Sequence, residues 1–224
     1  MSASTSQMFT QVLHTQWKWA RWLLLAGTIA GFALPLLSVQ GAGGGSREWQ
    51  ARMLLSQMTS WSPLYVILAA LLGLLLGVSA WTADHRGRHI YALSLPVTRA
   101  RFAMLRWASG AVLLLLPALA LWGGAILACV ATRLPPGITA YPGSLAGRFA
   151  LAALVAYALF FLVSAGTTRT AGLVLGVLAA ILAAEFLVTY FTGETKLIKT
   201  IGEALFYWPG PFEVFTGRWM LFDV

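Results

Sequence analysis

Five long apolar runs divide this chain, and each is about as long as a membrane-spanning helix. A helix needs about 20 apolar residues to cross the hydrocarbon core of a bilayer, which is about 30 Å thick. Because the runs are continuously apolar, they predict helices and not the alternating strands of a membrane barrel. The predicted spans are residues 22–39, 64–81, 107–130, 149–165 and 171–191.

The segments outside the spans have distinct patterns. Residues 1–21 mix aromatic, aliphatic and polar side chains, which favours an interfacial amphipathic helix ahead of a transmembrane domain over 22–224. The stretch 40–46 is mostly glycine and favours a hinge, and the pattern over 47–58 favours a short surface helix. After the fifth span, residues 194–221 predict short external helices that could dip back toward the membrane.

Composition changes this picture little. Hydrophobic residues make up 59% of the 224 residues and charged residues only 10%, against about 25% charged in soluble domains. A soluble domain of this length could not bury so much apolar surface. We therefore expect an all-α membrane protein, a polytopic helical bundle with five visible transmembrane helices.

Charge sets the expected orientation. The net charge is +8, and five of the 15 basic residues lie in the segment 84–106 between the second and third spans. Short basic loops stay in the cytoplasm, so we expect this loop and the N-terminus to be cytoplasmic. Because the basic residues lie at span ends, lipid headgroups explain them better than nucleic acid does.

Motifs for catalysis within this chain are missing. There is no phosphate-binding glycine loop, so we expect no nucleotide hydrolysis by the chain itself and no enzymatic activity. His85 and His89 have the spacing of metal ligands on a helix, but Arg86 and Arg88 lie among them and no third ligand is near. We expect no metal site, and we expect Cys129 to be a packed thiol.

Two features inside the spans are candidate functional sites. Glu185 lies in the fifth span, where a charge is costly, so it marks a translocation path or subunit interface, or it bonds to a neighbouring helix. Pairs of glycines four residues apart let helices approach closely, either within the chain or at a dimer seam. These pairs are Gly27 and Gly31, Gly73 and Gly77, and Gly172 and Gly176.

The basic loop resembles a known family. Residues 86–87, 91–99 and 102–107 are similar to the loop after the second span in the permease subunit of a type-2 ATP-binding-cassette exporter. In that family a short coupling helix ends in a leucine-proline turn, and a basic residue then opens the third span. The residues that the resemblance assigns to partner coupling are Asp84, Arg86, Arg88, Tyr91, Leu93, Leu95, Pro96, Arg99 and Arg101.

The resemblance implies a role and partners. Within the coupling loop 84–101, residues 84–93 would dock on a separate ATPase subunit, which would bind the ATP and Mg²⁺, so this chain would hold no cofactor. The permease would pair with a second copy or a homologue through its first and fifth spans, in a bacterial cytoplasmic membrane. Because family members have six spans, we expect the sixth to lie beyond this sequence.

Three other functions are compatible with the pattern. The chain could be a scaffold that holds a membrane complex together without transport. Secondary transport usually requires more polar groups or broken helices inside the membrane, and an intramembrane enzyme requires polar residues that face each other. For a transporter, few fixed charges in the spans favour a hydrophobic or amphipathic substrate.

Overall fold

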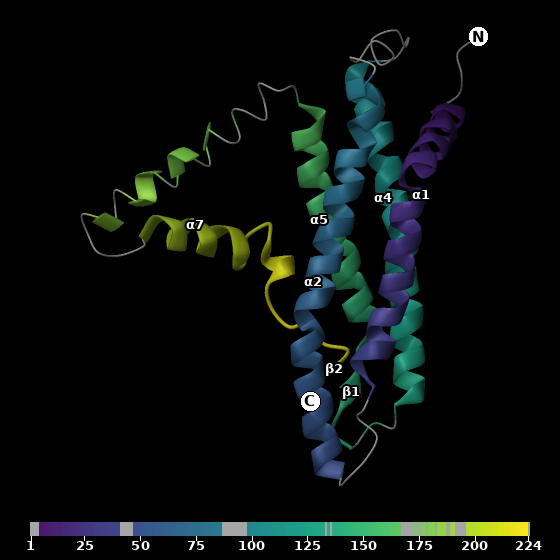
Figure 1. The fold of residues 1–224 in the computed structure, drawn as a ribbon, viewed down its shortest axis with the longest axis vertical. Coiled ribbons are helices and arrows are strands. Elements are labelled where there is room, and N and C mark those ends of the chain that lie inside the picture. Colours follow the sequence, from purple (N-terminus) through teal and green to yellow (C-terminus); the bar gives the residue numbers. More distant parts are fainter. Residues whose placement is uncertain are drawn as a thin grey trace. The chain divides into compact units, whose positions relative to one another are not determined.

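Four long apolar helices dominate the described part of the chain (Figure 1). The computed structural model describes residues 5–40, 47–86, 98–132, 134, 136–166, 173, 176–177, 179–181, 183–186, 189–190 and 196–223. The four helices are α1 (Thr5–Ser38), α2 (Arg47–Arg86), α4 (Arg99–Ala131) and α5 (Pro142–Ala165). Each is long and apolar enough to cross a membrane, which supports an all-α, multi-pass membrane protein.

The number of spans differs from the sequence prediction. Among the described residues four helices could cross a membrane, whereas the sequence predicts five spans. The predicted fifth span, 171–191, lies partly outside the described residues, and its described residues are helical. It therefore stays a prediction.

Two of the helices are longer than the spans predicted within them. The 34 residues of α1 correspond to about 51 Å at 1.5 Å per residue, more than the hydrocarbon core requires. Residues 5–21 and the first span are thus one continuous helix, not two elements. Likewise α2 joins the expected surface helix 47–58 to the second span and continues through Pro63.

The chain divides into two compact units. The first comprises Met1–Phe161 with Arg218–Val224, and the second comprises Leu162–Gly217. The first unit contains α1, α2, α4 and most of α5, which lie side by side in Figure 1.

Helices α1 and α4 run in the same direction. The side chain of Gln16 bonds to the backbone of Arg106 near their N-terminal ends. Further along, a methyl group added at Gly124 would meet the backbone of Phe32. Residue numbers of the contacting positions increase together along both helices, so the two helices are parallel. Gly124 lets the two backbones come close.

The direction of α2 is opposite to that of α1. Gly27 faces Leu72, and the Tyr65 hydroxyl donates to Ser38 Oγ at 3.2 Å. The position on α2 moves backward as the position on α1 moves forward, so the two helices are antiparallel.

Helices α2 and α5 again run in parallel. Gly73 faces the backbone of Ala153, and a methyl group at Gly77 would lie 2.9 Å from the amide nitrogen of Phe161. The directions of α1, α2, α4 and α5 therefore alternate along the chain. Alternation is what consecutive crossings of one membrane require.

The C-terminal residues belong to the unit that contains the bundle. Strand β1 (Thr139–Ala140), just before α5, pairs antiparallel with β2 (Phe222–Asp223). The side chains of Trp219, Leu221 and Phe222 are buried in this unit. Burial of three large apolar side chains anchors the end of the described chain to the bundle.

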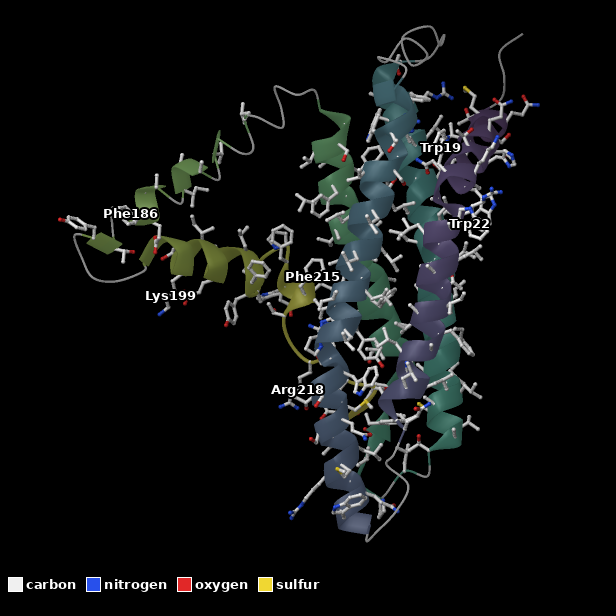
Figure 2. The ribbon with its side chains drawn as sticks, viewed as in Figure 1. Trp19, Trp22, Phe186, Lys199, Phe215 and Arg218 are labelled. Atoms are coloured by element: carbon white, nitrogen blue, oxygen red, sulfur yellow. The ribbon has the colours of Figure 1, made fainter. Side chains whose placement is uncertain are left out.

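The second unit contains the expected short helices after the fifth span. They are α7 (Lys196–Phe206) and the single turn η1 (Glu213–Phe215). The rings of Phe206, Phe212 and Phe215 pack together, with centroids 5.5 and 6.3 Å apart. Figure 2 shows Lys199 on α7 and Phe215 on η1. Within the predicted segment 194–221, residues 196–206 are helical, whereas its external position and its approach to the membrane stay predictions.

Candidate functional site

A buried cluster of polar and aromatic side chains joins all four long helices. We call it the polar cluster, and its members are Gln16 of α1, Trp81 of α2, Arg106 and Ser109 of α4, and Tyr157 of α5. It lies at the end of the bundle where α2 ends and α4 begins.

The backbone carbonyl of Arg106 is the centre of the hydrogen bonding. Gln16 Nε2 donates to this oxygen at 3.0 Å, and the Tyr157 hydroxyl donates to it at 3.3 Å. The Ser109 hydroxyl lies 2.9 Å from the same oxygen and 2.6 Å from Gln16 Oε1. Because these groups are buried, loss of one partner leaves another polar group unsatisfied.

The guanidinium of Arg106 lies between aromatic rings. Its Cζ is 4.9 Å from the ring centroid of Trp81 and 5.1 Å from that of Phe102. A cation over an aromatic face at this distance gains about 2 kcal/mol or more when water is excluded. Arg106 is only 6% exposed, so the rings stabilise a charge that would otherwise be costly to bury.

Local helix geometry explains why these groups meet. Phe102 precedes Arg106 by four residues and Ser109 follows it by three, so all three share one face of α4. Trp81 is held by its own contacts, because its Nε1 donates to the carbonyl oxygen of Phe161 at 3.1 Å and the two rings lie 5.2 Å apart.

Gly110 makes room for the tyrosine of the cluster. A methyl group at Gly110 would collide with the hydroxyl oxygen of Tyr157 and with its ring carbons. The close approach of α5 to α4 at this level therefore depends on a glycine.

Most of the predicted coupling residues cannot be placed. Arg88, Tyr91, Leu93, Leu95 and Pro96 lie outside the described residues. For three other coupling residues the structure describes the helical backbone but not the side chains, and these are Asp84, Arg86 and Arg99. Arg101 is described, and its Nη2 donates to Thr5 Oγ1 on α1.

The predicted glycine pairs of the first and second spans are used within the chain. A methyl group at Gly31 would lie 2.9 Å from the carbonyl oxygen of Pro117. At Gly27, Gly73 and Gly77 a methyl group would lie 2.9 Å or less from an atom of another helix. Their surfaces are thus occupied by neighbouring helices of the same chain. Gly172 lies outside the described residues, and Gly176 is exposed.

Glu185 lies in the second unit. Its side chain is 5% exposed, whereas the next residue, Phe186, is 70% exposed. The carboxyl group is therefore buried, and its place on a translocation path or in a subunit interface stays a prediction.

An apolar groove between α4 and α5 is a weaker candidate. It has a volume of about 290 Å³, and the side chains that line it are Ala111, Val112, Leu114, Leu115, Ala150, Leu151 and Leu154. Ligand sites normally have a few polar groups that fix orientation. The residues lining this groove are all alanine, valine or leucine, so nothing in it orients a ligand.

Metal ligands do not gather in the described residues, where no group of three or more His, Cys, Asp or Glu side chains could hold an ion. The side chains of His85 and His89 are outside that part of the chain.

Sequence reasoning missed the polar cluster, although signals for it exist. Gln16 continues the stripe of Ala20, Leu24, Gly27 and Gly31 that α1 buries, so its position predicts an inward-facing amide. Arg106 lies within the apolar stretch that opens the third span. Its ring partner Trp81 ends the second predicted span, where a tryptophan is typical of an interfacial aromatic belt and does not indicate a buried partner.

Comparison of the chain with protein-family models, with curated proteins and with solved structures gave no significant match.

Proposed function

We propose that this chain is the membrane-spanning permease subunit of an ATP-binding-cassette transporter. ATP is hydrolysed by a separate subunit that docks on the basic loop between α2 and α4. The substrate is hydrophobic or amphipathic, since the described spans carry few fixed charges.

The contact between Arg106 and Trp81 is the main support for this proposal. These residues come from the two helices that flank the basic loop, and the ring centroid is 4.9 Å from Arg106 Cζ. A force applied to the loop would therefore act on both α2 and α4. The hydrogen bonds that Gln16 and Tyr157 donate to Arg106 would transmit this force to α1 and α5. Packed helices that switch between two discrete arrangements can transmit such a movement to a distant translocation path.

Arg101 supports the same transmission. It is one of the predicted coupling residues, and its guanidinium bonds to Thr5 near the start of α1. Movement of the loop would therefore be felt at the N-terminal end of α1 as well as in the polar cluster.

Pairing with a second permease copy would use the fifth span. Gly27 and Gly31 are occupied within the chain, whereas Gly176 is exposed. The path for substrate would lie near Glu185, whose carboxyl group is buried in the second unit.

Affinity purification from the native membrane tests the proposal. We expect the chain to carry with it, in stoichiometric amount, a nucleotide-binding subunit with ATPase activity. Replacement of 87–97 by a glycine-serine linker of equal length should abolish this association. The same treatment of 41–46, which are mostly glycine already, should not. A stable assembly without any ATPase would overturn the proposal and favour a scaffold.

A further inference from the structure

The exposed face of α1 changes character abruptly along its length. Lys18 and Arg21 are exposed, and Trp22 is 72% exposed. The exposed large side chains that follow on α1 are all apolar, and they are Leu25, Ile29, Phe32 and Leu37. A helix that passes from the lipid headgroups into the hydrocarbon core typically has basic residues first, then an aromatic residue, and then aliphatic residues.

The geometry of Arg21 fits this boundary. Its Cζ lies 5.4 Å from the ring centroid of Trp22, so the cation rests on an aromatic side chain at the edge of the apolar stripe. Figure 2 shows Trp22 on α1. Lys18 lies one turn before Trp22, on the same face.

Acidic side chains are missing from this part of the sequence. Residues 1–46 contain no Asp or Glu, and neither does α4, which runs parallel to α1. The cations at positions 18 and 21 therefore have no carboxylate on these two helices as a partner.

We propose that Lys18, Arg21 and Trp22 form a binding surface for the headgroup of an anionic phospholipid. The phosphate and its net negative charge complement the two cations, the indole lies at headgroup depth, and the acyl chains follow the apolar stripe of α1. A second copy of the chain fits this face poorly, because a twofold seam there would bring like charges together. The inference does not rest on the transporter proposal.

Native mass spectrometry of the whole chain in mild detergent tests it, with phosphatidylglycerol and phosphatidylcholine of identical acyl chains in competition. The wild type should retain phosphatidylglycerol in preference. K18Q/R21Q should weaken its binding by about fivefold per cation, or about 25-fold in all.

Two further variants make the result specific. R52Q/K199Q also removes two exposed cations, but at sites on α2 and α7, and should leave the preference unchanged. K18R/R21K keeps the charge and should retain most of the binding. Equal effects of both glutamine pairs, no effect of K18Q/R21Q, or a gain of dimer in that variant would each overturn the inference.

Discussion

Arg106 on α4 lies over the ring of Trp81 on α2, with its Cζ 4.9 Å from the ring centroid. The two residues are 25 positions apart in the sequence and are separated by the basic loop. This contact joins the C-terminal end of α2 to the N-terminal end of α4, and Arg106 also bonds to residues of α1 and α5. Under the proposed function, movement of the loop would pass to the bundle through this contact.

Trp81→Ala should destabilise the protein strongly. The substitution removes a buried ring, leaves a cavity and removes the aromatic face from a buried cation, and core Trp→Ala changes cost about 3–5 kcal/mol. Trp122→Ala is the matched control, because Trp122 is on α4 but is 45% exposed. In thermal melts of the detergent-purified protein, W81A should melt well below W122A. Similar melting temperatures would contradict the structural role of the ring.

Two adjacent glycines of α4 should respond in opposite ways to alanine. A methyl group at Gly124 would meet the backbone oxygen of Phe32 and would lie 3.0 Å from its carbonyl carbon. Backbone atoms cannot easily move aside, so G124A should cost about 1–3 kcal/mol. At Gly123 the nearest atom is 4.0 Å away, and alanine favours a helix by up to about 1 kcal/mol. G123A should therefore be neutral or stabilising; equal thermal stability of the two variants would argue against close α1–α4 packing.

Phe222→Ala should release the C-terminal strand. Phe222 is fully buried and pairs through its backbone with Ala140, and such truncations cost about 3–5 kcal/mol. A C-terminal tag should then be removed by protease much faster than in the wild type. Tyr207→Ala is the control, because that side chain is 66% exposed. Unchanged cleavage of F222A would show that the pairing does not hold the terminus.

Cysteine labelling tests the direction of the helices. Thr98 precedes α4 and Gly143 lies in the first turn of α5, so the two positions are separated by one crossing. With Cys129 replaced by alanine, G143C should react with a membrane-impermeant maleimide in intact cells. T98C should react only after permeabilisation. The reverse pattern would place the basic loop outside and exclude docking on a cytoplasmic ATPase.

Hydropathy predicted the existence of the described long helices but not their ends. A run of apolar residues indicates only the part of a helix that crosses the hydrocarbon core. The more polar residues 5–21 of α1 were therefore predicted to form a separate helix. Pro63 did not end α2, because a helix can continue past a proline when other groups satisfy the freed carbonyl.

The polar cluster was beyond sequence reasoning for a different reason. Gln16 and Arg106 are 90 positions apart, and their meeting depends on the rotation and register of two helices. Glycine spacing similarly predicted close packing at Gly31 but could not identify Pro117 as the neighbour. Such pairings need tertiary contacts, which a single sequence does not contain.

The most direct test of the transporter proposal is the ATPase rate of the purified complex with charges reversed at the loop. R99E/R101E alters two predicted coupling residues, while R52E/K199E reverses two exposed cations elsewhere. Because charged interface pairs dominate such docking, we expect R99E/R101E to lower ATPase association or stimulation by about tenfold or more. The control should match the wild type. Unchanged association and stimulation in R99E/R101E, with the chain correctly inserted, would contradict the proposal.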